Sequence, residues 1–262
     1  MNLMPAGSYR EGDSVLHKMD SFSKLFCTIL LLVAVVLSDN VPGYGLMTGI
    51  LLVLVRISRL GLGTALGGTR RMRFFFCVIL LMNGAFFEAE HFWWKWWIFQ
   101  FSAEGFLQGL QVVLRVAMAM VLGNLLVSAT SPLELVGAME SLMYPLKYIG
   151  IPVRDVAMIL GVAIQFIPTF SEEADMIRKA QTARGARFES RKLSEKAKSI
   201  VPLVVPIFLA AFRRADELAL AMEARGYRRT KGKIRRRRRK LSVADLVGLL
   251  LCTFLCCAEA AL

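Results

Sequence analysis

The sequence predicts an all-α, polytopic membrane protein with about five transmembrane helices and a cytoplasmic domain of one short and two long bent helices. The 262 residues are 56% hydrophobic with positive mean hydropathy, too apolar for an ordinary soluble domain. Lys and Arg number 33 against 20 Asp and Glu, which indicates a basic aqueous face. Apolar runs dominate residues 1–130 and return in residues 241–262, so we expect two membrane parts around a cytoplasmic domain at residues 131–240.

Two apolar segments begin the membrane part. Residues 22–37 contain few polar side chains and, with their flanks, are long enough to span about 30 Å of hydrocarbon. Asp20 is placed to cap this helix by accepting from its free N–H groups. After a turn at residues 38–45, a short second span starts near Val41 and continues to Val55.

Two further spans follow, separated by an aromatic segment. The third span covers residues 74–87 and the fourth covers residues 106–128. Between them, all four tryptophans lie within residues 91–99. Tryptophan rings prefer the headgroup layer of a bilayer, so we expect an interfacial helix or loop there.

Arg115 lies near the middle of the fourth span, where a charge is costly and normally has a partner or a polar cavity. Two interpretations stay open. One is a contact with another subunit or a lipid headgroup. The other is an intramolecular pair, with Glu134, Asp155 or a helix carbonyl as the partner.

The loop charges predict the orientation. Basic residues between positions 56 and 73 belong inside, whereas the connections at residues 38–45 and 88–104 are acidic or neutral and belong outside. The N-terminus is then cytoplasmic, and a last crossing at residues 241–262 makes the C-terminus external.

The cytoplasmic domain begins with a capping box. Ser131, a proline at the first helical position and Glu134 are expected to open a short helix that runs to about Tyr148. Residues 150–152, Gly-Ile-Pro, should end it and start the next helix.

Two long helices, at residues 153–183 and 194–224, are each about 45 Å long. The first half of each is apolar on nearly all sides, and the second half is amphipathic. An apolar stretch of 13 residues is too short to span the bilayer and is expected to be buried or to lie at the interface. Three prolines should bend these helices: Pro168, Pro202 and Pro206.

Both long helices end in the same motif. Ala183-Arg184-Gly185 is repeated 41 residues later as Ala224-Arg225-Gly226, and an Ala-Asp pair precedes each copy at the same distance. Glycine accepts the left-handed backbone that stops a helix. Each arginine is therefore held at a helix tip, where its five donors can grip a carboxylate or backbone carbonyls. The alternative is that both arginines only offset the negative helix ends.

The residues after the second tip are almost purely basic up to Lys240. Because an apolar segment follows directly, we expect them to contact anionic lipid on the cytoplasmic side rather than nucleic acid. The sequence lacks a phosphate-binding loop, metal-spaced histidines and a nucleophile elbow, so we expect no catalytic residues, metal or cofactor. The five cysteines are expected to be small apolar residues.

Several motifs together resemble those of the T component, the transmembrane coupling subunit of energy-coupling factor transporters. The motifs lie at residues 17–20, 130–135, 166–169, 179–185 and 213–227. The last two are the most specific for the family. Residues 21–23 and Gln165 depart from the family pattern, which weakens any claim about Gln165.

The resemblance implies a non-enzymatic subunit of a vitamin or metal ion importer in a prokaryotic cell membrane. In the family, the two tips dock on two cytoplasmic ABC-type ATPases. The apolar halves of the long helices cradle a substrate-binding S component, which implies contacts from six residues: Phe166, Pro168, Pro202, Pro206, Phe208 and Phe212. Two other classes stay open, an integral membrane enzyme and a basic membrane anchor for nucleic acid or a partner complex.

Overall fold

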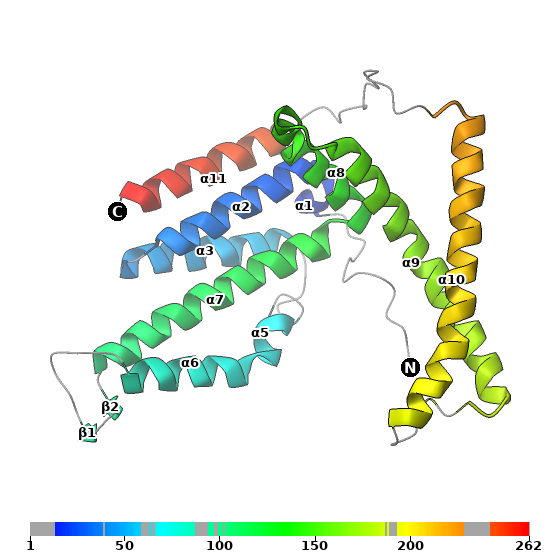
Figure 1. The fold of residues 1–262 in the computed structure, drawn as a ribbon. Coiled ribbons are helices and arrows are strands. Elements are labelled where there is room, and N and C mark those ends of the chain that lie inside the picture. The colour runs from blue at the N-terminus through cyan, green and yellow to red at the C-terminus, as the bar shows by residue number, and fades with distance from the viewer. Residues whose placement is uncertain are drawn as a thin grey trace. The chain divides into compact units, whose positions relative to one another are not determined.

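The computed structural model describes residues 14–38, 40–58, 63, 66–86, 94–96, 99–101, 103–186, 188, 193–227 and 242–261 (Figure 1). Helices dominate these residues, so the predicted all-α class is confirmed. The chain divides into two compact units, one formed by Gly7–Ala157 with Arg239–Leu262 and the other containing Met158–Arg238. Each unit is described by itself.

The first unit is a bundle of apolar helices. Its elements are α1 (Val15–Lys18), α2 (Ser21–Leu37), α3 (Val41–Ser58), α5 (Gly67–Arg71), α6 (Arg73–Phe86), α7 (Ala103–Ala129), α8 (Pro132–Leu142), the 3-10 helix η1 (Tyr144–Ile149) and α11 (Val243–Ala261). The predicted positions of the first four spans correspond to α2, α3, α6 and α7. By length and composition, α7 can cross a membrane, whereas α2 and α6 have 17 and 14 residues.

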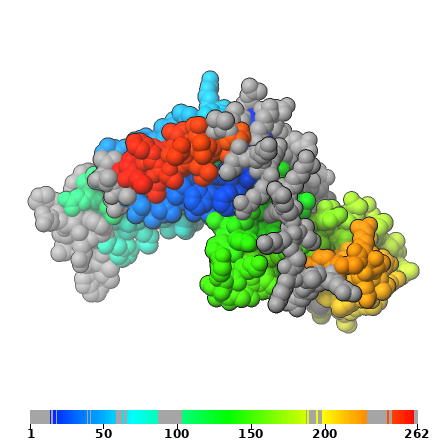
Figure 2. Space-filling view, turned by 90° about the horizontal axis from the view of Figure 1, so that it is seen from above, coloured from blue at the N-terminus to red at the C-terminus, as the bar shows by residue number. Residues whose placement is uncertain are grey.

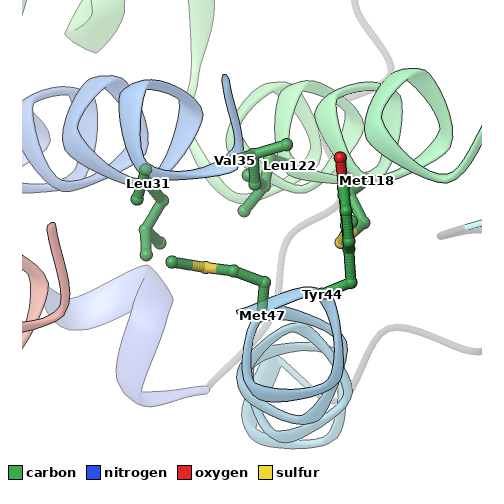
Figure 3. Packing of buried hydrophobic residues seen from close by; sticks show 7 residues of the cluster. Leu31, Val35, Tyr44, Met47, Met118 and Leu122 are labelled. Carbon is green, nitrogen blue, oxygen red and sulfur yellow. The ribbon is translucent and has the colours of Figure 1, made fainter. Parts of the chain in front are cut away.

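The core of this unit lies where α2, α3 and α7 meet. Figure 3 shows their side chains converging from three directions. The spacing within each helix is three or four residues, which places the contributing side chains on one face. The cluster contains Leu31, Ala34, Val35, Tyr44, Met47, Met118 and Leu122.

Helix α11 lies along α2 and is parallel to it, as Figures 1 and 2 both show. At its N-terminal end, the Asp245 carboxylate accepts hydrogen bonds from Asp20 N (2.9 Å) and Ser242 N (2.7 Å). Asp245 is only 1% exposed. The predicted capping role of Asp20 is wrong, because its side chain makes no cap hydrogen bond. Asp20 contributes its backbone N–H to a carboxylate of another helix instead.

The C-terminal end of α11 packs closely against the end of α2 and the start of α3. A Cβ on Gly43, in the first turn of α3, would lie 2.5 Å from Ser38 Oγ and 2.6 Å from Glu259 Oε2, so a larger residue there would have to displace these two side chains. Glu259 is 5% exposed. Buried carboxylates therefore lie at both ends of the α11 surface that faces α2.

The aromatic segment forms a strand pair rather than the expected interfacial helix or loop. Strands β1 (Trp94–Trp96) and β2 (Phe99–Phe101) are antiparallel, with Lys95 opposite Gln100. Aromatic residues favour extended backbone, which explains the strands. Residues 91–93 and 97–98 lie outside the described residues.

The helix at Ser131 begins as predicted and ends early. The Ser131 hydroxyl accepts from Glu134 N at 3.3 Å, with proline at the first helical position. However, α8 stops at Leu142, and η1 replaces the rest of the expected helix. Pro145 has no N–H to donate to an α-helical carbonyl, which explains the change to 3-10 geometry. Gly150, at φ 89°, then ends η1 as expected.

The second unit contains most of α9 (Val153–Ala183) and all of α10 (Leu193–Ala224). The division between the units falls within α9, after Ala157. Both helices have the predicted bounds to within one residue, and Pro168, Pro202 and Pro206 lie inside them. By length and composition the whole of α9 could cross a membrane, so the expectation that its apolar half is too short to do so does not hold for the complete helix.

Candidate functional site

The first tip is a left-handed helix stop. Gly185 has φ 89°, and its N–H donates to Thr182 O at 3.0 Å. The N–H of Ala186 donates to Gln181 O, also at 3.0 Å. This pair of bonds is the Schellman arrangement, which satisfies the last carbonyls of α9. Arg184 is left exposed at the C-cap position.

The second tip repeats this geometry bond for bond. Gly226 has φ 69°, and its N–H donates to Glu223 O at 2.8 Å. The N–H of Tyr227 donates to Met222 O at 2.9 Å. Arg225 occupies the same C-cap position as Arg184 and is also exposed. The repeat in the sequence is therefore a repeat in three dimensions.

The two tips are far apart because α10 separates them. Helix α10 has 32 residues and is about 48 Å long. It begins eight residues after Gly185, and eight residues span at most about 27 Å. Arg225 must then lie at least about 20 Å from the first tip. A single binding socket for both arginines is excluded by this distance.

Helices α9 and α10 cross (Figure 1), and a cation–π cluster joins them there. The Arg214 guanidinium of α10 lies over two rings of α9, 5.9 Å from the Phe166 centroid and 5.8 Å from the Phe170 centroid. The two rings are 5.8 Å apart and tilted by 60°. A guanidinium over an aromatic face is an attractive cation–π contact, so the crossing has a specific anchor.

The apolar half of α10 is open to its surroundings. Phe208 and Phe212 are 59% and 65% exposed, with ring centroids 6.4 Å apart. Pro168 and Pro202 are exposed, and Pro206 is half-buried. Of the six residues that the resemblance implies for the S component, Phe166 differs, because Arg214 covers its ring. A large apolar surface of this kind marks a contact with protein or membrane.

Arg115 binds partners inside the first unit through Nη2, while its buried Nε atom makes no hydrogen bond. Its Nη2 atom donates to Ser38 O and to the Tyr44 hydroxyl, both at 2.8 Å. Its guanidinium also lies 5.9 Å from the centre of the Tyr44 ring. Of the partners considered from the sequence, the helix carbonyl is therefore the one that the structure shows. Arg115 fastens the C-terminal end of α2 and the start of α3 to α7.

Sequence reasoning missed Arg214 and Asp245. The Ser242-x-x-Asp245 pattern is a capping-box signature that could have drawn attention to Asp245. Arg214 directly precedes the Ala-Asp pair of the second repeat, at the position where the first repeat has Glu173. All five cysteines are free, and the described residues contain no group of three metal-ligating side chains.

Comparison with known proteins identifies the family. The family model named CbiQ, with the description cobalt transport protein, matches residues 12–235. The chain belongs to this family, the T components of energy-coupling factor transporters. It is 39% identical to the energy-coupling factor transporter transmembrane protein EcfT of Brevibacillus brevis over 87% of this chain and 86% of the relative.

Other relatives carry the same name. EcfT of Acidaminococcus fermentans is 36% identical over 94% of this chain and 91% of its own length. EcfT of Bacillus subtilis is 34% identical over 91% of this chain and 90% of its own length. The prediction of a T component is confirmed, and this T component is a membrane protein that belongs to a transporter complex.

Proposed function

We propose that this T component docks on two ABC-type ATPases through Arg184 and Arg225 and couples their ATP hydrolysis to movement of a substrate-binding S component. The observation that carries the proposal is the pair of exposed arginines on identical helix stops, too far apart for one socket. The chain itself is non-catalytic. The cargo is a vitamin or a metal ion held by the S component.

Each tip exposes its arginine side chain and leaves it available to a partner protein. The backbone groups around Arg184 and Arg225 are bonded within their own Schellman motifs. In the described part of the chain, neither guanidinium is drawn into a hydrogen bond or an ion pair. Carboxylates or backbone carbonyls of a partner can therefore receive all five donors of each fork.

The crossed helices supply the connection between tips and membrane. When the ATPases close, the two tips move relative to each other, and α9 and α10 carry this motion to their apolar halves. There, Phe208 and Phe212 would contact the S component. Reversing a two-state population from 1:99 to 99:1 requires about 5.5 kcal/mol of differential binding, so strong contacts at both tips are needed.

The proposed orientation has a cytoplasmic N-terminus and an external C-terminus. The parallel packing of α2 and α11 supports it, because both helices must then cross in the same direction. The expected lipid contact of the basic segment after Gly226 falls on residues 228–241, which lie outside the described residues. The membrane lipid and the two kinds of protein subunit complete the proposed partners.

Charge reversal at the tips tests the proposal. The Arg184→Glu/Arg225→Glu variant should lose co-purification of the ATPases and substrate uptake by whole cells. Loss of a charge-assisted hydrogen bond costs about 1.5–3 kcal/mol, or about 10- to 150-fold in affinity for each tip. Lys147→Glu and Lys198→Glu are matched controls, because both positions are exposed basic residues outside the two tip motifs. Uptake at the wild-type rate in the double variant would refute docking through the tips.

A further inference from the structure

We propose that Arg214 is a pin with two positions at the crossing of α9 and α10, with Phe166 and Phe170 as the first position and Glu173 as the second. The proposal rests on the proposed coupling function, because movement between the two positions would be the step that carries motion through the crossing. It assigns a positioning role to Arg214 and Glu173, neither of which lies at a tip.

The first position is the one that the structure shows. Arg214 lies 5.9 Å and 5.8 Å from the centres of two rings that are one helical turn apart on α9. Arginine suits this place better than lysine because its planar group stacks on aromatic faces. The contact is electrostatic and has no donor–acceptor geometry to satisfy, so it can be released without leaving a broken hydrogen bond.

The second position is a carboxylate on the same face of α9. Glu173 follows Phe166 and Phe170 at seven and three residues, a spacing that keeps all three on one stripe. It lies about 4.5 Å beyond Phe170 along the helix axis. The Oε2 atom of Glu173 is buried and accepts no hydrogen bond. Within the described residues, no ion pair joins Glu173 to Arg214.

A buried carboxylate oxygen without a donor is costly and needs an explanation. An arginine held one turn away by aromatic rings is the donor that would satisfy it. Exchange of the ring contacts for an ion pair would leave each state stabilised by a different interaction. Packed helix crossings move between such discrete positions and do not deform continuously.

The helix arms beyond the crossing would carry a shift there to the tips. Arg214 lies 11 residues before Arg225, and Phe170 lies 14 residues before Arg184. These arms are about 16 Å and 21 Å long. A slide of about one turn at the crossing is therefore transmitted by two rigid arms of similar length to both tips.

Distances between spin labels would detect the two positions. Lys179→Cys and Leu220→Cys place labels at exposed sites on the two arms, in a chain whose native cysteines are replaced by serine. The complex, purified from the native host, is measured without nucleotide and after trapping with a non-hydrolysable ATP analogue. We expect two distance populations whose ratio changes on trapping. A single, unchanged distance under both conditions would overturn the proposal.

Matched variants assign the populations to residues. Glu173→Gln should deplete the population that trapping favours, whereas Glu172→Gln, an exposed neighbour, should not. The Phe166→Leu/Phe170→Leu variant should shift the ratio the other way by about 5- to 30-fold, the factor expected for two lost cation–π contacts. Equal populations in Glu173→Gln and Glu172→Gln would refute the role of Glu173.

The test separates this proposal from the proposed function. If no ATPase co-purifies with the wild-type chain, docking fails, and the distances are measured on the chain alone. The proposal for Arg214 then requires that the Phe166→Leu/Phe170→Leu variant still changes the ratio of the two distance populations relative to the wild type. If the ATPases co-purify and no variant shifts the ratio, docking stands and the pin is refuted.

Discussion

Replacement of Asp245 by asparagine is the sharpest test of the first unit. The carboxylate accepts from Asp20 N at 2.9 Å and from Ser242 N at 2.7 Å, and it is 1% exposed. Asparagine is nearly the same size but has only one acceptor oxygen. One of the two N–H groups would then face an NH2 group in a buried place. A hydrogen bond to a charged group contributes about 1.5–3 kcal/mol, so we expect Asp245→Asn to destabilise the α2–α11 contact by about 2–3 kcal/mol.

The rate at which a thiol reagent labels Cys27 measures how often α11 separates from α2. Cys27 is buried, and its sulfur lies 4.0 Å from a Cβ built on Gly248 of α11. In a chain whose other cysteines are replaced by serine, a thiol reagent should reach Cys27 only when α11 separates from α2. A loss of 2–3 kcal/mol raises the open fraction, and with it the labelling rate, by about 30- to 150-fold.

The control for this experiment is Glu104→Gln. Glu104 is also a carboxylate in the first turn of a helix, but it is exposed. Its removal loses only an interaction with the helix dipole, about 1 kcal/mol or less, and at most about fivefold in labelling. Equal labelling rates of Cys27 in Asp245→Asn and Glu104→Gln would refute the bridging role of Asp245.

Three further predictions concern the same unit. Gly43→Ala should lower thermal stability by about 1–3 kcal/mol through overpacking, while Gly45→Ala, with nothing within 4 Å of the added methyl, should not; equal melting temperatures would contradict this. Mild oxidation should join Cys27 to Cys252, because Cys27 is buried on α2 and Cys252 of α11 packs against the core cluster to which α2 contributes; mass spectrometry of the digested chain would detect the linked peptides, and their absence would argue against the α2–α11 register. Arg115→Gln should destabilise the chain by about 3 kcal/mol or more, because it removes two bonds to a charged donor; a melting temperature like that of wild type would show that these bonds are dispensable.

Local signals in the sequence predicted much of the fold. The glycine stops at residues 185 and 226, the Ser131 cap and the bounds of α9 and α10 depend on a few neighbouring residues, and all agree with the structure. The end of α8 was missed although its cause is also local. Pro145 lies inside the stretch that the apolar spacing marked as helix, and the missing donor of proline outweighs that spacing.

Contacts between segments far apart in the chain could not be predicted from local sequence patterns. Asp20 and Asp245 are 225 positions apart, so the cap expected of Asp20 could not be weighed against a partner from α11. The contact of Arg214 with Phe166 and Phe170 could not be predicted for the same reason, because it forms only where α9 and α10 cross. The tips were predicted because a helix stop is encoded by its own residues.

The arginines of this chain differ in what satisfies their donors, and this difference separates structural from functional roles. Arg115 binds a carbonyl and a hydroxyl within its own bundle, so another subunit is not needed to explain its charge. Arg214 binds two rings, an interaction that can be exchanged for the orphaned carboxylate oxygen of Glu173. Arg184 and Arg225 are exposed on helix stops whose backbone N–H groups already donate to carbonyls of their own helices. The same guanidinium group is therefore hydrogen-bonded inside the first unit, held over rings at the crossing of α9 and α10, and exposed at the tips, where the proposed function needs it to bind partners.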